Sequence, residues 1–130
     1  MSADIWSFVK EEAERLRQER IERLGGEILR IEPGQTYVIE LRNENWRRVT
    51  TRFGERIVIP ILHNNEPKVL MLNPRGRLYR MLVEELAKLA DRKPERVVVT
   101  IKREGVGRLT NYTVKAEPVE EAKSRKRQYQ

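Results

Sequence analysis

The chain has 130 residues, 38% of them hydrophobic and 36% charged, with a formal net charge of +7 and an isoelectric point of about 10.0. This length allows one domain with a modest core and excludes a second catalytic domain. Cys is absent, which excludes disulfides and thiolate metal sites. Abundant Arg, Glu and Lys are typical of proteins that work at high temperature through surface ion pairs.

The positive charge belongs mainly to the middle of the chain. Residues 1–24 carry five basic and six acidic groups (net −1), residues 25–118 carry eighteen and twelve (net +6), and residues 119–130 carry four and two (net +2). This distribution predicts a polyanionic partner. No apolar run approaches the roughly 20 residues that span a bilayer, and a signal peptide pattern is missing, so we expect a cytoplasmic protein without membrane contact.

The first 26 residues are predicted to form a separate N-terminal helix, from about Ala3 to Leu24. Ser2 or Asp4 can cap its start, and Gly25-Gly26 ends it. Its apolar stripe predicts packing across an open end of the domain, with self-association or docking onto another protein as the alternative. The stripe consists of Ile5, Val9, Ala13, Leu16 and Leu24.

From Glu27 the hydrophobic period changes to that of strands separated by turn residues. Pro33-Gly34 and Gly54-Glu55 each lie between two such runs, which form either a hairpin or one bent strand. The runs are Glu27–Ile31, Thr36–Arg42, Arg47–Phe53, Arg56–Leu62, Lys68–Leu72, Arg96–Arg103 and Arg108–Glu117.

A second, core-facing helix is predicted over Arg75 to Arg92. Leu78, Leu82, Leu86 and Leu89 form its apolar stripe, and Pro94 ends the pattern. Residues 119–130 have almost no apolar side chains and are predicted to be a disordered basic tail. Its cations Lys123, Arg125, Lys126 and Arg127 would act as a non-specific electrostatic arm or serve solubility.

If the two runs around Pro33-Gly34 and the two around Gly54-Glu55 are each counted as one bent strand, the order of elements is helix, three strands, helix, two strands, tail. This predicts a mainly β protein: a five-stranded OB-fold (Greek-key) barrel over residues 27–118, with a helix between strands 3 and 4 and the additional N-terminal helix.

Four segments, ILRIEPGQTYVIEL, TRFGERIVIPIL, VLMLNPRGRLYRMLVEELAKLA and GRLTNYTVKAEP, together resemble the small OB-fold single-stranded DNA-binding proteins of archaea, phages and archaeal viruses. The short patterns TxxG and YxV are part of this resemblance. The resemblance implies a protein of a thermophilic archaeon or its virus that coats or protects single-stranded DNA in replication, recombination or repair. An RNA-binding protein and a protein–protein adaptor that uses the N-terminal helix are the alternatives.

OB-fold binding surfaces usually lie on the second and third strands, bordered by the loops after the first and fourth. Those places hold much of the basic excess, and residues 42–56 alone contain five Arg and two Glu. Arg and Lys would neutralise phosphates, while aromatic rings would stack on bases. The candidate nucleic-acid-binding residues are Arg42, Trp46, Arg47, Arg48, Arg52, Phe53, Arg56, Lys68, Asn73, Arg75, Lys102, Arg103, Arg108 and Tyr112.

The aromatic candidates each have a structural alternative. Trp46 either stacks on a base or covers a barrel edge, and Tyr112 is either half-core or a ligand contact. Regular alternation places Phe53 with Val49 on one face and Arg52 on the other, so ring and guanidinium cannot both face ligand unless Gly54 marks a bulge.

Catalytic chemistry has little support in the sequence. The chain has one His, His63, and its only aspartates are Asp4 and Asp91. A transition-metal cluster would lack ligands, and Gly105-Val106-Gly107 lacks the following helix of a phosphate-binding loop. We therefore expect a non-catalytic protein without metal or cofactor.

Overall fold

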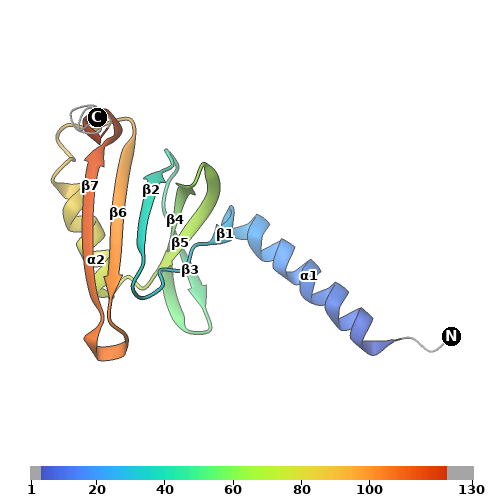
Figure 1. Cartoon of the computed structure of the whole chain (residues 1–130). Coiled ribbons are helices and arrows are strands. Elements are labelled where there is room, and N and C mark those ends of the chain that lie inside the picture. The colour runs from blue at the N-terminus through green and yellow to red at the C-terminus, as the bar shows by residue number, and fades with distance from the viewer. Residues whose placement is uncertain (1–3, 123–130) are drawn as a thin grey trace.

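The computed structural model describes residues 4–122, which form a mixed β-sheet with one helix packed against it and one helix that projects from it (Figure 1). The projecting helix, α1, runs from Ile5 to Leu24. Asp4 caps its start through a hydrogen bond from the Trp6 backbone N–H (3.0 Å). Gly25, with a φ of 86°, ends it by donating to the Ile21 carbonyl. Both caps were predicted from the sequence.

Seven strands form one sheet in the order β1-β5-β4-β2-β6-β7, and β3 also pairs with β4. Strand β4 pairs with β5 along one edge, and with β3 and then β2 along the other. The strands are β1 (Glu27–Ile28), β2 (Thr36–Leu41), β3 (Arg47–Thr51), β4 (Gly54–His63), β5 (Glu66–Leu72), β6 (Val97–Glu104) and β7 (Asn111–Pro118).

The prediction of a closed five-stranded barrel is wrong, because over residues 4–122 the strand order ends at β1 and β7. The outer edge of β5, which a closing strand would need, pairs in parallel with β1, where Glu27 lies opposite Lys68. Gly26 permits this approach: a Cβ at its position would lie 3.1 Å from the Lys68 Cα. The edge of β5 is therefore taken by the segment that directly follows α1.

The predicted run Arg47–Phe53 ends two residues early. Thr51 is the last residue of β3, Arg52 and Phe53 form the hairpin turn, and Gly54 begins β4 with a φ of 107°. The Thr51 hydroxyl stabilises the turn, since it accepts from the Phe53 backbone N–H (3.1 Å) and donates to the Gly54 carbonyl (2.8 Å). This segment is thus a hairpin rather than a bent strand.

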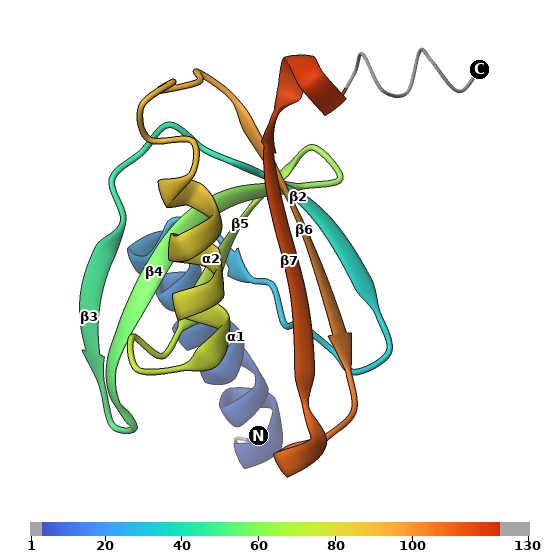
Figure 2. The same ribbon diagram turned by 90° about the vertical axis from the view of Figure 1, so that its left-hand side faces the viewer.

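Helix α2 (Arg77–Ala87) covers one face of the curved sheet, while α1 lies on its other side (Figure 2). Leu78 and Leu82 of α2 are buried against alternate residues of the strands. Leu86 also packs against this core, so three members of the predicted stripe are confirmed. The helix is shorter than the predicted Arg75–Arg92, and Leu89 lies beyond its end. The strand residues of this main core are Ile39, Ile57, Ile59, Ile61, Leu70, Leu72, Val99, Ile101 and Val114.

The opposite face holds a smaller cluster, in which Val58 and Val69 are fully buried and contact Leu24 from the end of α1. Because both β4 faces are covered at this point, residues 57–61 are all buried. This second cluster is where α1 joins the sheet.

The C-terminal end of the described chain continues beyond β7 as helix over residues 119–122. Val119 is buried, and its backbone N–H donates to the Arg96 carbonyl (3.0 Å). The predicted disordered tail therefore does not begin at Val119, and its four cations lie outside the described residues. Within residues 4–122, no helix has the length and apolar composition needed to cross a membrane.

Candidate nucleic-acid interface

A cleft of about 660 Å³ lies between the C-terminal end of α1 and the sheet face formed by β3, β4 and β5. Its lining contains five arginines and no carboxylate. These arginines are Arg20, Arg23, Arg47, Arg52 and Arg56. A volume of this size is within the usual range of small-molecule sites, roughly 300–1,000 Å³.

The floor of the cleft is apolar. Leu24, Ile28, Val49 and Met71 line it, and all four belong to the smaller core cluster. Val49 is on the same strand face as Arg56, its direct partner across the β3–β4 ladder. The alternation of β3 and β4 thus places apolar side chains at the bottom and arginines beside them.

Three of the cleft arginines, Arg47, Arg52 and Arg56, have carbonyl or aromatic partners in place of carboxylates. Arg47 donates from Nη2 to the carbonyls of Arg23 (3.1 Å) and Leu24 (2.9 Å), the last carbonyls of α1. Arg56 donates to the Glu55 carbonyl (2.8 Å). Over residues 4–122 none of the five makes an ion pair. Five like charges without a counter-charge in the lining give this cleft a positive potential.

Phe53 supplies an exposed aromatic ring at the cleft. Its position in the hairpin turn leaves 72% of the residue exposed. The Arg52 Cζ lies 5.0 Å from the Phe53 ring centroid, within cation–π distance. The conflict between Phe53 and the arginines disappears, because Phe53 and Arg52 lie in the turn and are not subject to strand alternation.

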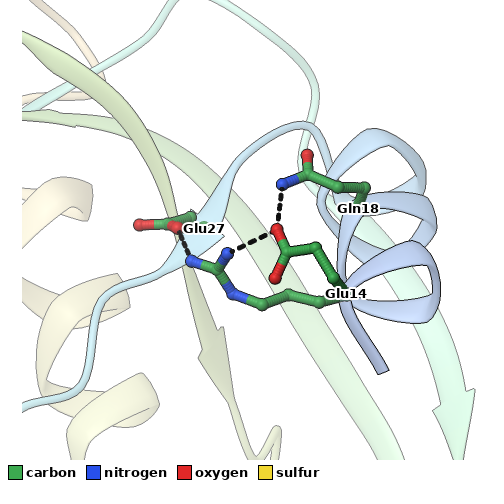
Figure 3. A network of polar contacts seen from close by, with 4 residues as sticks. Glu14, Gln18 and Glu27 are labelled. Carbon is green, nitrogen blue, oxygen red and sulfur yellow. Dashed lines mark hydrogen bonds and ion pairs between the residues drawn. The ribbon is translucent and has the colours of Figure 1, made fainter. Parts of the chain in front are cut away.

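A polar network connects the helical wall of the cleft to the sheet (Figure 3). Arg17 of α1 pairs with Glu27 of β1 and donates to Glu14 (3.3 Å), which also accepts from Gln18 (2.9 Å). Together with Arg47 at the helix end, these contacts orient the last turns of α1.

Three predicted residues near the cleft have other contacts. Arg48 lies opposite Ile57, on the face that Val49 does not share, and pairs with Glu55. Arg42 pairs with Glu44 (2.9 Å) and donates to the Gly25 carbonyl (3.4 Å). Trp46 is half-buried against the main core, with its ring 6.4 Å from that of Tyr79 in an edge-on arrangement.

Lys68, Asn73 and Arg75 do not line the cleft. Lys68 is half-buried on β5, opposite Glu27. The Asn73 Oδ1 accepts from the Arg75 backbone N–H (3.0 Å), which forms the turn before α2. Arg75 is exposed at that turn.

The remaining predicted residues belong to the β6–β7 hairpin. Lys102 pairs with Glu104 (2.9 Å), and Arg103 is half-buried and donates to the Ile31 carbonyl (2.7 Å). Tyr112 packs against the main core, and Arg108 is exposed in a short 3-10 helix, η1 (Gly107–Leu109). The tips of the β3–β4 and β6–β7 hairpins lie at the same end of the sheet (Figures 1 and 2). Arg108 is therefore at the same end of the molecule as Phe53.

Sequence reasoning missed Arg20 and Arg23, which form part of the helical wall. The available signal was the end of the apolar stripe: these arginines follow Leu16 at the three- to four-residue spacing at which apolar residues would continue. A helix stripe that changes from apolar to basic where the helix meets the domain indicates that its basic part faces a charged cleft and not an apolar core.

Within residues 4–122, no group of three or more His, Asp or Glu side chains is arranged to hold a metal ion. No family model, curated protein or solved structure matches the chain.

Proposed function

We propose that the protein is a non-catalytic binder of single-stranded DNA with little sequence preference. The observation that carries this proposal is the cleft with five arginines, no carboxylate and an exposed Phe53. Phosphates would replace the missing counter-charges, and each neutralised phosphate would release condensed counterions.

Both chemical halves of a nucleotide have a place in this cleft. The guanidinium groups of Arg52 and Arg56 provide donors for phosphate oxygens, and the Phe53 ring provides a face for an unstacked base. The apolar floor gives further contact area to the base. A duplex keeps its bases stacked inside, so this combination favours single strands.

Weak sequence preference follows from the rest of the lining. Apart from the arginines, the polar residues that line the cleft are Thr50 and Thr51. Among the described residues, no Asn, Gln or acidic side chain, the types that read adenine and cytosine edges, lines the cleft. Stacking and phosphate contacts tolerate every base.

We also infer that the sheet is a variant of the OB fold. Strands β2 and β3 both pair with the same edge of β4, so they can be counted as one bent strand. With β1 set aside, five strands remain, in the spatial order β5-β4-β2-β6-β7. In chain order, α2 lies between the third of them, β5, and the fourth, β6, as the helix does in the OB fold. Two hairpin tips at one end of the sheet also support this inference.

The test is a fluorescence anisotropy titration of labelled single-stranded and duplex oligonucleotides at several salt concentrations. We expect tighter binding of the single strand and affinity that falls as salt rises. Arg52→Ala and Arg56→Ala should each make the slope of log affinity against log salt shallower by about 0.7. Arg92→Ala is the matched control: it removes the same charge, from a pair with Glu121 distant in sequence from the cleft strands.

Equal affinity for duplex and single strand, or a slope that changes as much in Arg92→Ala as in Arg52→Ala, would refute the proposed site. A matched RNA strand that competes better than DNA would assign the cleft to RNA instead.

A further inference from the structure

The apolar side chains in the N-terminal part of α1 belong to neither core cluster of the described chain. The helix extends away from the sheet, and only its C-terminal end contacts the body (Figure 1). Trp6 is 71% exposed, Val9 46% and Leu16 51%. The prediction that this helix packs across the domain is therefore wrong, because its attachment at Leu24 and Arg47 directs it outward.

Four of the exposed apolar residues follow the spacing of a coiled-coil seam, while Ile5 and Phe8 are exposed beside it. Trp6, Val9, Ala13 and Leu16 are separated by three, four and three residues, as are the a and d positions of two successive heptads. The same register continues to Arg20 and Arg23, which line the cleft. The apolar seam thus ends where the helix reaches the domain.

The charge of α1 argues against a polyanion or an anionic membrane as the occupant of this seam. The helix contains five basic and five acidic residues, so its net charge is zero. The positive field needed to attract either surface is absent from residues 5–19, which carry three basic and four acidic groups, and is present in the cleft. A protein helix with a matching apolar seam fits the exposed face.

The charges that flank the seam favour a second copy in the parallel orientation. In this register Glu12 and Glu19 occupy g positions, and Lys10 and Arg17 occupy e positions. A parallel pair places Glu12 of each copy beside Arg17 of the other. An antiparallel pair would face acidic residues with acidic and basic with basic. The present contacts of Glu12 with Arg15 and of Arg17 with Glu14 are exposed ion pairs within the helix, which exchange at little cost.

We propose that α1 pairs in parallel with α1 of a second copy through Trp6, Val9, Ala13 and Leu16. The two helices diverge before Arg20 and Arg23, since four arginines would otherwise meet in the seam. Each arginine pair then remains in the cleft of its own copy. In a parallel pair the two domains lie at the same end of the paired helices, where the helices separate. A polyanion bound to both clefts would reduce the repulsion between their arginines.

Sedimentation equilibrium of the full chain without nucleic acid tests the dimer, independently of the proposed function. We expect a concentration-dependent dimer whose dissociation constant rises by about 10- to 100-fold in Leu16→Glu. Phe8→Glu is the matched control, because it also replaces an exposed apolar side chain by a carboxylate, at a c position outside the seam, and should change the constant little. A chain that stays monomeric at the highest soluble concentration, or a dimer that Leu16→Glu leaves intact, contradicts the proposal.

A single cysteine tests the orientation, since the chain has none of its own. In a parallel pair, Val9 of one copy lies beside Val9 of the other, so Val9→Cys should form an intermolecular disulfide rapidly under mild oxidation. Absence of this disulfide from a stable dimer overturns the parallel arrangement. A disulfide that forms only when Val9→Cys is mixed with Ala13→Cys indicates the antiparallel arrangement, in which these two positions of the seam lie opposite each other.

Discussion

Phe53 lies in the turn of the β3–β4 hairpin and Trp46 directly precedes β3, and the surroundings of the two side chains differ. Phe53 is in a tight turn with its ring exposed beside Arg52. Trp46 precedes β3 and packs on Tyr79 and the main core. A ring without packing partners is available for a base, whereas a half-buried ring contributes to folding.

Replacing Phe53 by Ala should weaken binding of single-stranded DNA by about 1–3 kcal/mol, because one stacking contact is lost. The free energy of unfolding should change by no more than about 0.5 kcal/mol, as at other exposed positions. Anisotropy titrations and urea unfolding measure the two effects. Unchanged affinity would remove Phe53 from the site.

Replacing Trp46 by Ala should produce the opposite result. We expect a loss of about 1–3 kcal/mol in the free energy of unfolding, less than the roughly 3–5 kcal/mol of a fully buried aromatic. The affinity of the folded protein for DNA should stay unchanged. A large loss of affinity with normal stability would instead assign Trp46 to base stacking.

At the scale of elements, α1 depends on its two ends. Its C-terminal carbonyls are held by Arg47, and its first turn is capped by the Asp4 carboxylate. Hydrogen bonds from the Ser7 hydroxyl (2.9 Å) and the Trp6 backbone N–H lower the pKa of Asp4 below its ordinary value. The folded helix thus favours the charged form of Asp4.

This linkage predicts a pH dependence of the helix start. The stabilisation by Asp4 is fully present above its unfolded pKa of about 3.9 and is lost as the pH falls through the lower folded value. Far-UV circular dichroism should show a loss of helix in that acidic range. Asp4→Asn should lose less, since its amide oxygen accepts the cap hydrogen bond at every pH. Identical acid profiles for both proteins would contradict the assigned cap.

At the scale of the whole molecule, the cleft exists because α1 and the sheet meet at one short junction. Gly26 lies at that junction, where β1 takes the edge of β5. This pairing joins Glu27 and Ile28 to Lys68 and Val69. It therefore occupies part of the β5 edge and also places Ile28 and the end of α1 in the lining of the cleft.

Gly26→Ala should disturb the junction, because its Cβ would lie 3.1 Å from the Lys68 Cα and 3.2 Å from the Pro67 carbonyl oxygen. We expect a loss of about 1–3 kcal/mol in stability together with weaker DNA binding. Gly34→Ala is the control: its φ of 77° is also strained for Ala, but no atom lies within 4 Å. Equal effects of the two substitutions on urea unfolding and binding would show that the junction does not require Gly26.

Local signals determined much of the fold. The ends of α1 follow from Asp4 and Gly25, which act within one turn of the helix, and the buried face of α2 follows from the spacing of Leu78 and Leu82. Arg52 and Arg56 were predicted for the site because residues 42–56 contain more Arg than Glu. This excess can be counted in the sequence without knowing which distant segments come into contact.

Tertiary structure alone decided the rest. Arg20 and Arg23 join Arg52 and Arg56 across about thirty residues of sequence, because β1 pairs with β5 and places the C-terminal end of α1 against one sheet face. The sheet is also open where a closed barrel was expected. Strand pairing and helix direction depend on contacts between distant segments, which residue spacing does not encode, whereas caps, stripes and charge excess are properties of neighbouring residues.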